Sequence, residues 1–181
     1  MHGVVVYDYE IGRHRVGNGE YAAFLNAVAG KSDPHGLHHP RMRIDRRGIA
    51  GAYTYTAHPA TALDAVTYVS WHDALRYCNW LHGGDSERGA YSFTGETSSG
   101  ARRPGAKVFL PTEDEWVKVV YYDIVLKNYE VFVASHSEMS CPPTDIPRSP
   151  NGMLGIEDRI WEWTESRVGE LFRGLRSDSW F

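Results

Sequence analysis

Three long irregular stretches constrain the fold of this 181-residue chain more than any other feature of its sequence. Residues 31–64, 83–106 and 124–158 are rich in polar and turn-forming residues and show no sustained apolar period. The short apolar patterns between them do not alternate regularly as strand, helix and strand, which argues against a parallel α/β sheet. We therefore expect an α+β fold in which short strands are mixed with two or three short helices.

The composition is typical of one globular domain, with 42% hydrophobic and 23% charged residues. The net charge of −4 argues against a nucleic-acid partner, because proteins that bind nucleic acid usually carry a basic surface. No apolar run approaches 18 residues, so we expect no membrane-spanning helix. The first residues lack the features of a signal peptide, so the chain as written is predicted to be cytoplasmic unless an export signal precedes Met1.

Three segments carry apolar residues at helical spacing, each after a residue that can cap a helix N-terminus: Asn18, Ser70 and Thr112. An acidic residue follows Ser70 and Thr112 by three positions, which predicts a capping box at both. The predicted apolar faces contain Tyr21, Phe24, Leu25 and Val28; Trp71, Ala74, Leu75, Cys78 and Leu81; and Trp116, Val119 and Val120. These faces are the expected core.

Short strands are expected where apolar and polar residues alternate, at residues 4–9, 53–56, 65–69, 90–94, 107–110, 160–164 and 171–173. In the segment 160–164, alternation places Trp161 and Trp163 on one face of the strand and Glu162 on the other. One of these faces packs against the core, and the other is a candidate surface for a site.

Nine histidines and a run of arginines suggest metal and anion sites. A non-haem iron site needs two histidines and a carboxylate on fixed elements, whereas His35, His38 and His39 lie in a loop and are expected to be solvated. The arginines of residues 41–47 are expected in a solvated loop as well. The acidic residues 113–115 are explained by the cap and dipole of a helix N-terminus rather than by acid–base catalysis.

Four segments in order along the chain carry a resemblance to a known family. They are residues 9–25, residues 66–81, the run Leu-Pro-Thr-Glu-Asp-Glu-Trp at 110–116, and Trp-Glu-Trp at 161–163 followed by residues 173–180. This pattern resembles the formylglycine-generating enzyme, or sulfatase-modifying-factor, family, whose members are often secreted or surface proteins of bacteria. The resemblance implies a C-type-lectin-like fold with a small twisted antiparallel sheet. It also implies one domain over residues 1–181, incomplete at its C-terminal end.

The chemistry of that family is the copper-dependent oxidation of a sulfatase cysteine to formylglycine, which needs two thiolates as soft ligands for Cu(I). In catalytic members the first thiolate comes three residues after a serine that corresponds to Ser179, and the printed sequence stops at Phe181. Cys78 lies on a predicted helix face and is expected to be a small buried hydrophobe, and Cys141 is expected in a loop. We therefore predict no catalytic residue and no copper site in this chain.

The resemblance also implies a calcium loop. Its ligands would be the Glu162 side chain, the carbonyls of Asp158 and Ile160, and the Asp158 side chain, because Gly155 stands where the family has Asp or Asn. Calcium takes six to eight oxygen ligands, so this substitution weakens the site. The other interpretation of Glu162 is a surface or salt-bridged carboxylate.

Family geometry places the expected ligand site at the C-terminal end of the chain, with Trp161, Trp163, Arg173, Ser179 and Trp180 lining it. An arginine there can pair with a carboxylate in bidentate fashion, and the indoles can stack on a ring or a sugar. The alternative is that Trp161 and Trp163 fill the core.

Three functional interpretations follow. The first is a non-catalytic module with a degenerate active site that binds a peptide, a protein or a glycan. The second is an oxidase of the family whose thiolates lie beyond this chain. The third is a fragment impaired in folding, because a missing last strand leaves an unpaired sheet edge.

Overall fold

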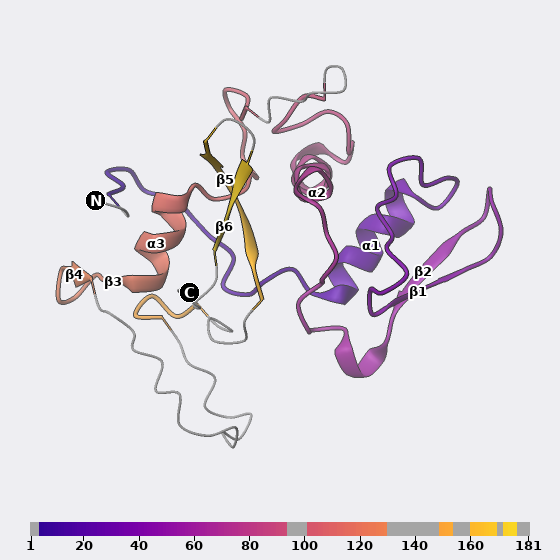
Figure 1. Cartoon of the computed structure of the whole chain (residues 1–181), viewed down its shortest axis with the longest axis horizontal. Helices are drawn as coiled ribbons and strands as arrows, with labels where there is room; N and C mark the ends of the chain where they lie inside the picture. The colour runs from indigo at the N-terminus through magenta and orange to yellow at the C-terminus, as the bar shows by residue number, and fades with distance from the viewer. Residues whose placement is uncertain (1–3, 94–100, 130–148, 154–159, 170–171, 177–181) are drawn as a thin grey trace. The chain divides into compact units, whose positions relative to one another are not determined.

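The computed structural model of the chain describes residues 4–93, 101–129, 149–153, 160–169 and 172–176. The described parts confirm the α+β class, with three α-helices and three two-stranded antiparallel sheets (Figure 1). Two compact units are distinguished: unit 1 comprises Met1–Arg15 and Pro111–Phe181, and unit 2 comprises Val16–Leu110. No helix in the described ranges combines the length and the apolar character that crossing a membrane requires.

Unit 2 contains the helices α1 (Asn18–Val28) and α2 (Trp71–Gly83). Between them, β1 (Ile44–Arg47) pairs antiparallel with β2 (Thr54–Ala57), and a 3-10 turn, η1, follows at Pro59–Thr61. The stretch expected to be irregular therefore contains a hairpin. Its two strands supply Ile44 and Tyr55 to a core that also contains Tyr21, Phe24, Leu25, Leu37, Met42 and Tyr77.

The start of α1 differs from the prediction. Gly17, not Asn18, is the N-cap, and its N–H donates to Glu20 Oε2 at 2.8 Å. The Asn18 side chain instead donates to the carbonyls of Thr61 and Asp64, at 3.0 and 2.9 Å. The predicted cap is wrong because the Asn18 amide is committed to fixing the loop that follows β2.

The predicted start of α2 is confirmed, since Ser70 Oγ accepts from the N–H of Asp73 and the Asp73 carboxylate accepts from the N–H of Ser70. The buried residues of α2 are Trp71, Asp73, Leu75, Tyr77, Cys78 and Asn79. Leu81, expected on this face, is 48% exposed. Tyr77 is buried instead, because its ring packs edge-on against Phe24 of α1. The buried face of α2 therefore includes Tyr77 rather than Leu81.

Unit 1 is built on α3 (Glu113–Tyr121), which leads directly into a small hairpin of β3 (Tyr122–Asp123) and β4 (Asn128–Tyr129) (Figure 1). A longer hairpin joins β5 (Glu162–Val168) to β6 (Phe172–Arg176). The buried core of unit 1 contains Trp116, Val119, Val120 and Met153. As predicted, α3 starts with a capping box.

The capping box of α3 is formed by Thr112 and Glu115. Thr112 Oγ1 accepts from the N–H of Glu115 at 3.2 Å, and the N–H of Thr112 donates to Glu115 Oε2 at 2.6 Å. One turn of helix therefore satisfies two donors that the helix itself leaves without an acceptor.

Some predicted strands do not form. Residues 4–9 and 107–110 contain no strand, and residues 65–69 and 90–93 carry only isolated bridges. The segment 4–9 is held by side chains instead of a ladder, because Tyr7 and Tyr9 both donate from their hydroxyls to Glu115. The alternation of apolar and polar residues predicts an extended segment, but it does not show whether a strand ladder or side-chain hydrogen bonds hold that segment.

We expect Trp116→Ala to lower the free energy of unfolding by about 3–5 kcal/mol, because the side chain is 2% exposed in the core of unit 1. Trp161→Ala is the control, since that side chain is 53% exposed, and it should cost less than about 1 kcal/mol. Denaturant unfolding measures both losses, provided that the dependence of the unfolding free energy on denaturant concentration is unchanged. Equal losses in the two variants would contradict the assigned core.

Candidate functional site

The β5–β6 hairpin has two distinct faces, which its register defines. Trp163 pairs with Leu175, and Arg167 pairs with Arg173, across a β-bulge in β5. Arg173 and Leu175 are two residues apart on β6, so all four side chains lie on one face. We call this set the outer face.

The opposite, inner face carries the pair of Glu162 and Arg176 and the pair of Val168 and Phe172. Thr164, two residues after Glu162, belongs to the inner face too. It is fully buried, and its Oγ1 donates to the carbonyl of Gly174 at 3.0 Å.

Gly174 is required on the inner face for steric reasons. A Cβ atom at this position would lie 2.5 Å from Thr164 Oγ1 and 3.4 Å from the carbonyl oxygen of Ser166. The missing side chain allows β6 to approach β5 closely. The pairing that aligns Arg167 with Arg173 therefore depends on this glycine.

The first turn of α3 holds the hairpin. Glu113 forms an ion pair with Arg176, and its N–H donates to Ser166 Oγ at 2.9 Å. Just before the helix, the carbonyl of Pro111 accepts from the N–H of Glu165 at 2.8 Å. Contacts from two strands thus converge on one helix terminus, which fixes the direction of the outer face.

The outer face combines apolar and cationic groups. Arg167 is exposed and Leu175 is 37% exposed, whereas Trp163 and Arg173 are partly buried. Burial lowers the pKa of Arg173, and the charge of Arg167 lowers it further, while the Glu165 carboxylate acts in the opposite direction. Like charges directly opposite on paired strands repel, and a carboxylate close to both relieves that repulsion.

The predicted ligand-site residues are brought together in part. Trp163 and Arg173 share the outer face, and Trp161, one residue before β5, is 53% exposed. The alternative that Trp161 fills the core is therefore wrong. Ser179 and Trp180 lie outside the described residues. The sequence patterns do not identify Arg167, which pairs with Arg173. The one available signal is Gly169, whose φ of +67° is typical of a turn residue that brings the two strands together.

The predicted calcium ligands that the structure describes are engaged by an arginine. Arg15 Nε donates to Glu162 Oε1 at 2.9 Å, and an Arg15 terminal nitrogen donates to the carbonyl of Ile160 at 3.4 Å. A guanidinium on these two oxygens does not fit a bound Ca²⁺, since the two cations would repel each other. Glu162 is thus salt-bridged, the second of the two interpretations, and Asp158 lies outside the described residues.

Comparison with known proteins identifies the family. A family model described as a sulfatase-modifying factor enzyme 1-like domain matches residues 1–176. The chain belongs to the FGE-sulfatase family. No curated protein and no solved structure gives a significant match. Membership makes the α+β arrangement a C-type-lectin-like fold, and both compact units lie almost entirely within the matched range.

The described cysteine, Cys78, is a buried residue of a helix. This thiol is 6% exposed on the buried face of α2, as the helical spacing predicted. Cys141 lies outside the described residues.

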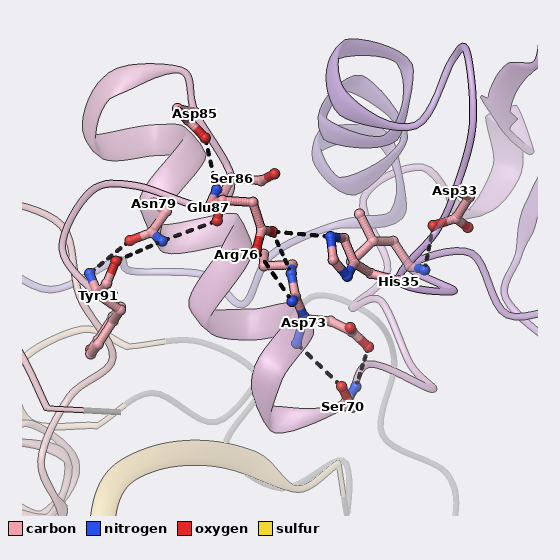
Figure 2. Close-up of polar contacts among 11 residues, drawn as sticks. Asp33, His35, Ser70, Asp73, Arg76, Asn79, Asp85, Ser86, Glu87 and Tyr91 are labelled. Carbon is pink, nitrogen blue, oxygen red and sulfur yellow. Dashed lines mark hydrogen bonds and ion pairs between the residues drawn. The ribbon is translucent and has the colours of Figure 1, made fainter. Parts of the chain in front are cut away.

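The histidines of residues 35–39 are held more firmly than predicted. His35 Nε2 lies 3.3 Å from Glu87 Oε1, and the same oxygen accepts from Arg76 Nε at 2.6 Å (Figure 2). His38 is half-buried, with Nε2 2.8 Å from the carbonyl of Ile44, so its prediction as a solvated residue is wrong. His39 is exposed, and its ring stacks on Tyr68.

A second polar group in unit 2 is structural. The fully buried Asn79 donates from Nδ2 to the carbonyls of Ser86 and Tyr91, and its Oδ1 accepts from the N–H of Tyr91 at 2.7 Å (Figure 2). One amide therefore fixes the loop after α2. Across the described ranges, no group of three or more His, Cys, Asp or Glu side chains is arranged to hold a metal ion.

Glu115 is a buried carboxylate with a structural role. It is 1% exposed, and its Oε1 accepts from the Tyr7 hydroxyl at 2.8 Å while its Oε2 completes the helix cap. Oε1 thus holds the N-terminal segment to α3, and Oε2 holds the start of the helix. The predicted role of this carboxylate in the helix cap is confirmed.

We expect Tyr9 to make unit 1 sensitive to alkaline pH. Burial, and then the charge of Glu115, raise the pKa of Tyr9 from 10.0 to about 12. The folded state therefore keeps a proton that the unfolded state loses, so stability is complete below pH 10 and falls as the pH rises toward 12. Wild type and Tyr9→Phe should differ most at pH 8 and converge in this window. A constant difference in unfolding free energy would contradict the assignment.

Proposed function

We propose that this FGE-sulfatase domain is a non-catalytic binding module and that its outer face binds peptides bearing carboxylate side chains. The observation that carries this proposal is the placement of Arg167 directly opposite Arg173 on paired strands. A carboxylate between these groups relieves their repulsion and accepts charge-assisted hydrogen bonds, which are stronger than neutral ones.

The apolar part of the outer face supports a peptide rather than a small inorganic anion. Trp163 and Leu175 form the next cross-strand pair beside the arginines. An indole offers a large apolar area with a polar N–H, a combination that is common where proteins bind peptides. The ligand we expect therefore places an apolar side chain near this pair and a carboxylate near the arginines.

The cysteines support a non-catalytic role. Copper-dependent oxidation by this family uses two thiolates that reach one Cu(I) ion. Cys78 is buried in α2 of unit 2 and engaged in the packing of that helix face. We infer that it does not serve as a copper ligand, and that copper is not a cofactor of this chain.

The binding test uses a short peptide of alternating glutamate and glycine, with a glutamine-for-glutamate peptide as its partner control. We expect chemical-shift changes at Trp163, Arg167, Arg173 and Leu175 with the first peptide only. Arg167→Gln should weaken binding by about tenfold or more, since a charge-assisted hydrogen bond contributes about 1.5–3 kcal/mol. Arg41→Gln removes the same charge from an exposed site in unit 2 and should leave binding unchanged.

Two outcomes would contradict the proposal. Equal weakening by Arg167→Gln and Arg41→Gln would show that only the net charge attracts the peptide. Conversion of a cysteine to an aldehyde in a Cys-x-Pro-x-Arg peptide, incubated with the protein and Cu(I) and followed by mass spectrometry, would instead establish the oxidase.

A further inference from the structure

Arg15 occupies an unusual position for a long charged side chain. It is the last residue of the N-terminal segment of unit 1, yet its side chain is only 9% exposed. Arginine is almost never buried to this extent without a partner. Among the described residues, Arg15 donates to the Glu162 carboxylate on β5 and to the carbonyl of Ile160, two residues before Glu162.

The chemistry of these partners is that of a cation site. One carboxylate oxygen and one backbone carbonyl oxygen, from residues two apart, converge on a single positive group. Glu162 is itself 22% exposed, so its charge is poorly screened and needs a nearby compensating charge. A guanidinium satisfies both oxygens with directed N–H donors. A calcium ion at the same place would need further oxygen ligands beyond these two.

We propose that the Arg15 guanidinium takes the place of a metal ion at the oxygens of Ile160 and Glu162, so that the fold of unit 1 does not depend on calcium. The N-terminal segment thereby supplies the positive charge that the start of β5 needs. The same ion pair sets the position of Glu162, whose cross-strand partner is Arg176.

A second arginine of the same segment provides a matched control. Arg13 is exposed, and its Nε donates to the carbonyl of Gly152 at 3.0 Å. It therefore ties the segment to unit 1 through one backbone oxygen, with no carboxylate involved in that bond. Comparing Arg13 with Arg15 separates general attachment of the segment from compensation of the Glu162 charge.

The first test uses the wild-type chain, so it does not depend on a variant that folds. The midpoint of thermal unfolding should be the same in excess EDTA and in millimolar Ca²⁺. Tb³⁺, a luminescent calcium analogue that nearby indoles sensitise, should give no saturable signal from Trp161 or Trp163. A saturable signal, or a calcium-dependent rise of the midpoint that Glu162→Gln abolishes, would overturn the proposal.

The second test uses variants. Arg15→Ala should lower the midpoint by about 5 °C or more, because it leaves a partly buried carboxylate without its cation. Arg15→Lys should restore part of that loss, and Arg13→Ala should have a clearly smaller effect than Arg15→Ala. Equal losses for Arg15→Ala and Arg13→Ala would show attachment alone and would overturn the role of Arg15 as a cation.

Discussion

The hydrogen bonds and ion pair at the N-terminus of α3 are the interaction on which the functional surface depends. A helix start presents backbone N–H groups and a positive end to its surroundings, and here a capping box satisfies part of that demand. The N–H of Glu113 donates to Ser166 and the Glu113 carboxylate pairs with Arg176, so this residue contacts both strands of the β5–β6 hairpin. These contacts hold the inner face at Ser166 and Arg176, whereas Val168 and Phe172 on the same face are 53% and 70% exposed.

Charge compensation explains how a loop-rich chain holds such a hairpin in place. The inner face carries two acidic–basic pairs of separate origin, Arg15 with Glu162 and Arg176 with Glu113. The outer face instead carries the opposed pair of Arg167 and Arg173. A two-stranded hairpin is marginally stable by itself, so these two ion pairs help to stabilise it.

The sequence predicted the features that depend on local patterns. Capping boxes at Ser70 and Thr112, and the burial of Trp116, follow from spacing within one helix, and all are confirmed. The role of Arg15 could not be predicted, because its partner Glu162 is 147 residues away along the chain. The resemblance supplied the family and the fold, but the residues that face one another became visible only through the register of the strands.

The measurement that tests the orientation of the hairpin most directly is solvent paramagnetic relaxation with a soluble gadolinium chelate. The account predicts strong broadening of the Leu175 methyl signals and of the Arg167 Nε–H signal, and little broadening of the Thr164 methyl signal. Comparable broadening of Leu175 and Thr164, or strong broadening of Thr164 alone, would contradict it, because Thr164 would then not be shielded on the inner face while Leu175 is exposed on the outer face.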